Sequence, residues 1–179
     1  MDRMVEFRKI EEASDPALVL VEESYTKSFP LGERRDFSLL KDLLSCETRF
    51  TLYALSHENQ HIGFLSFWQF DAFAYIEHFA IDQAVRNKGW GGTVLRRFAE
   101  KINPIVLETE PPVDEWSTRR LAFYERLGFV PLQRPYLQPP YREGEPWIPL
   151  RLMVYGSLPI ECRFEQLKQT IYQYVYKRK

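Results

Sequence analysis

The chain has 179 residues, of which 45% are hydrophobic, and this is enough for one folded domain with a sizeable core. Lys and Arg number 24 against 25 Asp and Glu, so the net charge of −1 argues against a nucleic-acid-binding protein, which usually carries a basic excess. No run approaches the ~18 apolar residues of a membrane-spanning helix. We therefore expect neither nucleic acid nor a membrane among its partners.

Cysteine usage and the N-terminal sequence favour a reducing compartment. The two cysteines, Cys46 and Cys162, cannot build a disulfide framework. The opening Met-Asp-Arg-Met-Val-Glu lacks the apolar segment of a signal peptide. These two features lead us to expect a cytoplasmic protein. Because the sequence shows no repeat and no linker, we also expect residues 1–179 to form a single domain, with a C-terminal helix over 163–176 as an extension.

The N-terminal third predicts a strand followed by two helices. Residues 4–10 alternate apolar and polar side chains, as a strand at the edge of a sheet does. Asp15-Pro16 is a typical helix start, because Asp caps the helix and Pro is tolerated in its first turn. The apolar faces of this helix and of a second one over 34–44 are formed by Leu18, Val21 and Tyr25 and by Phe37, Leu40 and Leu44.

Three predicted strands follow these helices. Residues 50–55 and 62–67 have strand composition and are joined by a hairpin loop over 56–61, and a third strand covers 73–81. His57 and His61 have the spacing H-x-x-x-H, but they lie on a predicted turn instead of a helix, so we expect no metal site here.

A glycine-rich turn then connects the third strand to a helix. The stretch from Arg86 to Gly92 reads Arg-Asn-Lys-Gly-Trp-Gly-Gly, and a helix is predicted over residues 90–101. The start of a helix leaves backbone N–H groups without acceptors, and these donors, with the positive end of the helix dipole, suit a phosphate group. Glycines let the backbone approach such a ligand closely. A generic glycine-rich turn before a helix is the alternative interpretation.

The spacing of this turn excludes two common phosphate-binding motifs. It contains neither the G-x-x-x-x-G-K-[ST] of a P-loop nor the G-x-G-x-x-G of dinucleotide-binding folds. The pattern present is R-x-x-G-x-G, formed by Arg86, Gly89 and Gly91.

A second motif lies about thirty residues further on. Residues 104–109 have the apolar run of a buried strand, and residues 117–129 predict a helix that ends in Tyr-Glu-x-x-Gly-Phe. Gly128 stands where the glycine that ends a helix belongs, and Phe129 opens the next strand.

Together the two motifs resemble those of the GNAT-type N-acetyltransferase superfamily, from about Phe64 to Leu132. The resemblance implies an α/β fold with a central, twisted, mostly antiparallel sheet of about seven strands, helices on both faces and a splayed parallel pair of strands at the CoA site. It implies acetyl-CoA as cosubstrate and no metal. The residues expected to bind the cofactor are Phe79, Ala80, Ile81, Arg86, Asn87, Lys88, Gly89, Trp90, Gly91, Gly92, Ser117 and Tyr124.

The resemblance also assigns catalytic roles. Tyr124 would protonate the leaving thiolate, and a backbone N–H near Phe79 would stabilise the oxyanion. Acyl transfer to an amine further needs a base that collects the ammonium proton. Our first choice is Glu77, because a Glu within an apolar strand is costly to bury without a purpose and its pKa would rise with burial. The alternatives are His78, Glu108 and Glu110.

Ser117 departs from the family pattern. It stands where an Asn often precedes the Tyr by seven residues, so it would either contact the pantetheine arm or cap the helix. Arg119 and Arg120 beside it would serve the CoA phosphates or lie exposed on the helix.

Residues 134–149 read as one irregular segment with five prolines. Prolines restrict a loop in advance and so lower the entropy lost when it orders around a ligand. The resemblance suggests a substrate lid, with Tyr136, Tyr141 and Glu108 as acceptor-binding residues; the alternatives are an ordered surface loop or a contact in a homodimer. The aromatic and acidic residues hint at a cationic amine.

Two functions are compatible with these patterns. The first is transfer of an acetyl group from acetyl-CoA to a primary amine of a small molecule or peptide, by direct attack in a ternary complex. The second is a catalytically silent module that binds acyl-CoA and senses or regulates. Retention of Tyr124 and of several candidate bases favours the enzyme. The sequence identifies neither the acceptor, nor the acyl-chain preference, nor the oligomeric state.

Overall fold

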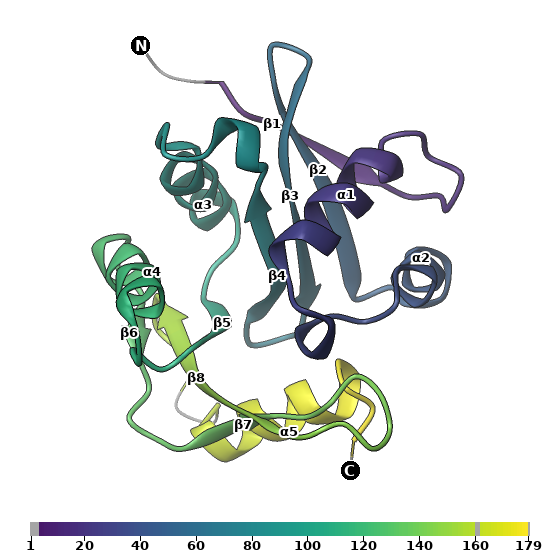
Figure 1. The fold of residues 1–179 in the computed structure, drawn as a ribbon. Coiled ribbons are helices and arrows are strands. Elements are labelled where there is room, and N and C mark those ends of the chain that lie inside the picture. Colours follow the sequence, from purple (N-terminus) through teal and green to yellow (C-terminus); the bar gives the residue numbers. More distant parts are fainter. Residues whose placement is uncertain (1–3, 160–161, 179) are drawn as a thin grey trace. The chain divides into compact units, whose positions relative to one another are not determined.

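The computed structural model describes residues 4–159 and 162–178. The chain divides into two compact units, which Figure 1 shows in the colours of the sequence. Unit 1 comprises residues 1–69 and 76–97, and unit 2 comprises residues 70–75 and 98–179. The strands follow the order β1-β2-β3-β4-β5-β8-β6, with β7 paired to β8. The fold is the expected mixed α/β type with a mostly antiparallel sheet, which has eight strands instead of about seven, and β4 and β5 are its parallel pair.

The sheet of unit 1 is built from β1 (Glu6–Ile10), β2 (Phe50–His57), β3 (Gln60–Gln69) and most of β4 (Ala74–Ile81). β2 pairs antiparallel with both β1 and β3. The hairpin between β2 and β3 is tighter than expected, since Glu58 and Asn59 alone form its turn, both with positive φ. Two-residue turns of this kind match the twist of the flanking strands, and Asn accepts the left-handed conformation readily.

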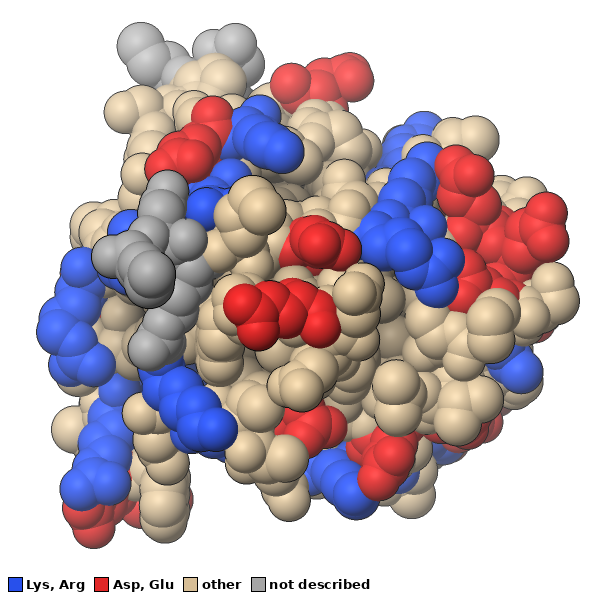
Figure 2. Space-filling view, turned by 90° about the horizontal axis from the view of Figure 1, so that it is seen from above, with Lys and Arg blue, Asp and Glu red and all other residues tan. Residues whose placement is uncertain are grey.

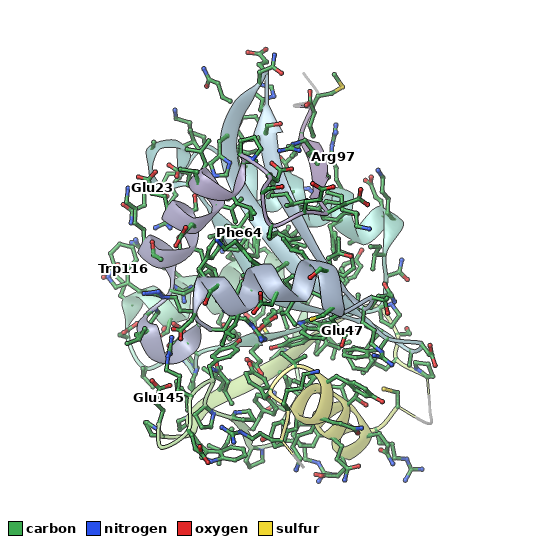
Figure 3. The ribbon with its side chains drawn as sticks, turned by 90° about the vertical axis from the view of Figure 1, so that its right-hand side faces the viewer. Glu23, Glu47, Phe64, Arg97, Trp116 and Glu145 are labelled. Carbon is green, nitrogen blue, oxygen red and sulfur yellow. The ribbon has the colours of Figure 1, made fainter. Side chains whose placement is uncertain are left out.

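Two helices cover strands of this sheet. α1 (Leu18–Ser28) packs against β3, and α2 (Phe37–Cys46) packs against β2 after a short 3-10 turn, η1 (Leu31–Glu33). The predicted face of α1 is confirmed, because Leu18, Val21 and Tyr25 are buried. In Figure 3, Phe64 of β3 points into the interior of this unit, whereas Glu23 of α1 lies at the surface.

The prediction for α2 was wrong in two details. The helix begins at Phe37 instead of residue 34, because the preceding residues form η1 and an extended stretch. Its third buried apolar residue is Leu43 instead of Leu44. Leu43 lies three residues after Leu40 and therefore on the same, covered face of the helix.

One glycine of unit 1 permits a close approach of two strands. A Cβ added at Gly63 of β3 would lie 2.1 Å from the carbonyl oxygen of Ala80 in β4, closer than any real contact. Gly63 has φ +151°, and Asp82, just after β4, donates its backbone N–H to Ile62 O at 2.9 Å. The end of β4 is therefore held directly against β3.

β4 leads through η2 (Gln83–Val85) into α3 (Trp90–Lys101). The bounds of α3 are those predicted from the sequence. Asp82 caps η2, since its Oδ1 accepts from the backbone N–H of Ala84 at 2.9 Å. The turn between η2 and α3 is the glycine-rich segment.

Unit 2 centres on β8 (Ile148–Tyr155). β5 (Ile105–Thr109), β6 (Val130–Pro131) and β7 (Tyr136–Gln138) all pair with it antiparallel. α4 (Glu115–Arg126) packs against β5. α5 (Phe164–Tyr174) runs along β7 (Figure 1), and the hydroxyl of Tyr172 donates to Leu137 O.

The prediction that residues 134–149 form one irregular segment was wrong. β7 lies within it, and β8 begins at Ile148. Tyr136 and Gln138 are buried while Leu137 is exposed, so three residues suffice to give the alternation of a strand. The prolines confine β7 to this length without preventing its pairing with β8.

No helix among residues 4–159 and 162–178 is long and apolar enough to cross a membrane. Figure 2 shows one face of the molecule, on which acidic and basic side chains are interspersed.

Candidate active site

The glycine-rich turn has the geometry of an anion cradle in unit 1. Asn87 and Gly89 adopt positive φ, +61° and +81°, and turn the chain into α3. Thr93 N donates to Gly89 O at 3.2 Å, so the helix starts at this turn. The N–H groups of the first helical turn have no acceptor within a helix, and Gly91 and Gly92 place no side chain over them. A Cβ at Gly92 would meet only the flexible end of Arg96, at 3.3 Å.

Arg86 holds this turn in place through its side chain. Its Nε donates to Ile81 O at 2.9 Å, and its Nη2 donates to the hydroxyl of Ser28 at 2.9 Å. The guanidinium thus ties the turn to the ends of β4 and α1. Trp90 is 7% exposed, and its ring lies 4.6 Å from that of His57. The aromatic contact secures the other side of the helix start.

The expected cofactor residues on β4 alternate in exposure. Phe79 and Ile81 are half-buried, and Ala80 between them is buried. This is the alternation that a strand with one covered face gives.

Glu77 is locked in an ion pair. Its side chain is 1% exposed; it accepts from Nη2 of Arg35, from Nε of Arg35 at 3.1 Å and from the indole N–H of Trp68 at 2.7 Å. Burial by itself raises the pKa of Glu77, but the charge of Arg35, the neighbouring His78 and these hydrogen bonds outweigh it, so the pKa lies below its ordinary value. The expectation of a raised pKa was wrong, because the sequence did not reveal the cation.

Two further candidate bases are also held by specific partners. His78 is buried between the rings of Tyr25 and Phe29, and its Nε2 donates to Glu33 O at 2.8 Å. Burial lowers the pKa of His78, which keeps the ring neutral. In unit 2, both oxygens of Glu110 accept from Nη1 of Arg120 at 2.6 Å.

In unit 2, Tyr124 lies near the end of α4. Its ring contacts those of Phe123 and Phe129, and its carbonyl accepts from Phe129 N at 3.1 Å. Burial raises the pKa of Tyr124 to about 12, with Arg120 opposing the rise and Glu110 adding to it. The phenol therefore keeps its proton throughout the neutral range. Gly128 ends the helix with φ +97°, as predicted.

Ser117 serves the start of the same helix. Asp114 is the N-cap and accepts from the backbone N–H of Ser117, while the Ser117 hydroxyl accepts from the backbone N–H groups of Val113 and Asp114 at 3.1 and 3.0 Å. The hydroxyl also donates to Asp114 Oδ1 at 2.7 Å, and the residue is 5% exposed. Of the two roles expected for Ser117, the structure shows capping, with Asp114 as the capping residue itself.

Glu108, the remaining candidate, is held by two phenols. The hydroxyl of Tyr136 donates to its Oε1, and the hydroxyl of Tyr176 donates to its Oε2 at 2.8 Å. The ring of Tyr141 lies 5.0 Å from that of Tyr176. The three residues expected at the acceptor site, Glu108, Tyr136 and Tyr141, thus gather around Tyr176 within unit 2.

Sequence reasoning missed Tyr176 and Tyr75. The hydroxyl of Tyr75 lies 3.3 Å from that of Tyr176, and both residues are buried. A tyrosine at a core position is the signal that was available, because a buried phenol needs a hydrogen-bond partner. Among the residues that the structure describes, no group of three or more His, Cys, Asp or Glu could hold a metal ion.

A glycine turn at a helix start, on a mostly antiparallel α/β sheet with one parallel pair of strands, is the arrangement of the GNAT class of acetyltransferases. Residues 48–131 match the model of the acetyltransferase (GNAT) domain. A solved structure from Bacteroides thetaiotaomicron, described as a "putative acetyltransferase from GNAT family", is 38% identical, with a TM-score of 0.92 over 97% of this chain and 99% of that one. This chain belongs to the GNAT acetyltransferase family.

Two other relatives are more distant. The "putative acetyltransferase YjbC" of Bacillus subtilis (strain 168) is 33% identical over 110 residues; the match spans 60% of this chain and only 55% of that protein. A GNAT family acetyltransferase from Elizabethkingia anophelis, solved with acetyl-CoA bound, is 17% identical with a TM-score of 0.57, over 88% of this chain and all of that one. At this level of identity, the similarity to the Elizabethkingia anophelis structure shows a shared fold only.

Proposed function

We propose that this protein is an N-acetyltransferase that transfers the acetyl group of acetyl-CoA to a primary amine by direct attack in a ternary complex. The observation that carries the proposal is the R-x-x-G-x-G turn at the start of α3, in a chain of the GNAT family. The N–H groups of this turn would hold the pyrophosphate, and the end of β4 would hold the pantetheine arm.

The reaction requires two proton movements. The amine attacks the thioester carbonyl only as a free base, whereas an unperturbed ammonium has a pKa near ~10.4. A carboxylate or a histidine can take that proton, directly or through water, as the C–N bond forms. When the C–S bond breaks, Tyr124 supplies a proton to the thiolate. Its phenol, with a pKa of about 12, is protonated and available for this step.

We assign the base to Glu108 in preference to Glu77. Arg35 neutralises Glu77, lowers its pKa and occupies one of its oxygens, while Trp68 occupies the other. The hydroxyls of Tyr136 and Tyr176 hold the Glu108 carboxylate close to Tyr141, among the residues expected to contact the acceptor. A carboxylate in this setting attracts an ammonium group and can accept its proton. The acceptor class that fits is a cationic primary amine.

The test is release of CoA thiol from acetyl-CoA in the presence of a panel of diamines, amino sugars and peptides with free amino groups. Amine-dependent thiol release, with the acetylated product seen by mass spectrometry, supports the enzyme. CoA binding by calorimetry with no turnover on any amine would instead indicate a silent binding module.

The cofactor assignment is tested by Gly91→Val. A side chain in the first turn of α3 would occupy the space proposed for phosphate, so CoA binding should be lost while the fold is retained. The control is Gly144→Asn, because Gly144 lies outside this turn, a Cβ there would meet open space, and Asn tolerates its positive φ of +84°. Unchanged CoA affinity in Gly91→Val would contradict the assignment.

A further inference from the structure

The segment that follows the C-terminal helix brings the side chain of Tyr176 to the proposed base. α5 and the residues after it lie beyond the 48–131 segment that matches the family model. Leu167 and Ile171 are fully buried, and Val175 is 1% exposed, so the segment is firmly packed. The Tyr172 hydroxyl fastens it to the backbone of β7 at Leu137. The position of Tyr176 is therefore determined by the packing of this segment.

Tyr176 stands in the middle of a chain of hydrogen bonds. Its hydroxyl donates to Glu108 Oε2 at 2.8 Å, so its contact of 3.3 Å with the Tyr75 hydroxyl is one in which Tyr75 donates. Burial, above all, and the nearby charge of Glu108 raise the pKa of Tyr176 well above its ordinary value. The hydroxyl therefore keeps its proton throughout the neutral range. Linked donors of this kind polarise one another and strengthen the bond to the carboxylate.

We propose that Tyr176 is a positioning residue that sets the orientation and the acidity of Glu108, and that the C-terminal helix is thereby part of the acceptor-binding apparatus. The inference rests on the proposed function in that Glu108 is taken to receive the amine. A Glu side chain has three rotatable bonds, and a donor on each of its two oxygens restricts the orientations that it can adopt. Tyr136 supplies the donor on Oε1 and Tyr176 the donor on Oε2.

The test is Tyr176→Phe, which removes the hydroxyl and keeps the ring. Since a hydrogen bond to a charged group is lost, kcat/KM for the amine should fall roughly tenfold or more. The acidic limb of its pH profile should move upward by roughly half to one pH unit, because the donor stabilises the charged carboxylate. The KM for acetyl-CoA should not change.

Tyr172→Phe is the matched control. It removes a hydroxyl from the same C-terminal segment, four residues before Tyr176, but one that bonds to Leu137 O instead of Glu108. The pH limb should stay in place in this variant. Equal shifts in both variants, or no shift in either, would overturn the proposal, because the helix would then act only through its general packing.

A readout without turnover separates this proposal from the proposed function. Titration of the Glu108 carboxyl carbon by NMR in ¹³C-labelled protein should give a higher pKa in Tyr176→Phe than in the wild type and in Tyr172→Phe. If no amine is acetylated but this shift is seen, Tyr176 positions Glu108 and the transferase function is wrong. If amines are acetylated and the shift is absent, the function stands and the role of Tyr176 is wrong.

Discussion

The two units each hold a carboxylate on a core strand, and the two carboxylates are held in opposite ways. In unit 1, Glu77 is paired with Arg35, whose side chain is 10% exposed. In unit 2, Glu108 accepts hydrogen bonds from two tyrosines. The cation of Arg35 compensates the charge of Glu77 within the fold, whereas the two tyrosine donors that orient Glu108 are neutral groups. We therefore assign a structural role to Glu77 and a chemical role to Glu108.

The ion pair also fixes the connection between α1 and α2. Arg35 lies in the extended stretch after η1, and its backbone N–H donates to the Tyr25 hydroxyl at 3.0 Å. His78, next to Glu77, binds the carbonyl of Glu33 in the same connection. Two neighbouring residues of β4 thus fasten one loop of unit 1.

Of the substitutions that test this comparison, Arg35→Met should have the largest effect, a loss of stability of the folded protein. It leaves a buried carboxylate without its cation, so the free energy of unfolding should fall by about 3–5 kcal/mol. The measurement is the midpoint and slope of urea denaturation. The double variant Arg35→Met with Glu77→Gln should recover part of the loss, since the uncompensated charge is gone. A loss below 1 kcal/mol in Arg35→Met would show that the pair contributes little to the fold.

Tyr124→Phe tests whether unit 2 supplies the proton donor as well as the base. Turnover should fall roughly tenfold to a thousandfold, with little change in CoA affinity, because the proton is needed only as the thiolate leaves. Steady-state kinetics and calorimetry give the two quantities. Weakened CoA binding with unchanged turnover would instead make Tyr124 a binding residue.

The pH dependence of stability gives a smaller effect with a definite sign. The folded pKa of Glu77 lies below the unfolded value of about 4.3, so its stabilisation is fully present above that pH and is lost as pH falls through the folded pKa. The difference in unfolding free energy between the wild type and Glu77→Gln should shrink below about pH 4.3. It should shrink by about 1.4 kcal/mol for each unit by which the pKa is lowered. A difference that grows on acidification would mean that burial dominates and the pKa of Glu77 is raised.

Local patterns predicted the scaffold well. Apolar spacing gave α3 with its observed bounds, and the Tyr-Glu-x-x-Gly-Phe run located the end of α4 at Gly128. Both features depend on residues that are close in the sequence, within one or two turns of the same helix. The three-residue strand β7 was missed, because two flanking prolines concealed an alternation visible only in the pairing with β8.

The sequence predicted candidate residues for the site, but not the contacts that these residues make with one another and with other side chains. Burial of Glu77 was recognisable from its apolar neighbours, but its partner Arg35 lies 42 residues away in the sequence. Tyr176 is separated from Glu108 by 68 residues, and nothing in its local sequence indicated this contact. These contacts depend on long-range packing, which the sequence does not reveal, so the proposal of Glu108 as the base required the structure.

The most direct test of the different roles of the two carboxylates is the pH profile of kcat/KM for an accepted amine in Glu108→Gln and in Glu77→Gln. Circular dichroism would confirm that both variants are folded under the assay conditions. Glu108→Gln should lose the acidic limb and reduce kcat/KM by roughly a hundredfold to ten-thousandfold, the usual range for a general base. Glu77→Gln should keep the limb where the wild type has it. Loss of the limb in Glu77→Gln, with an unchanged profile in Glu108→Gln, would contradict the assignment.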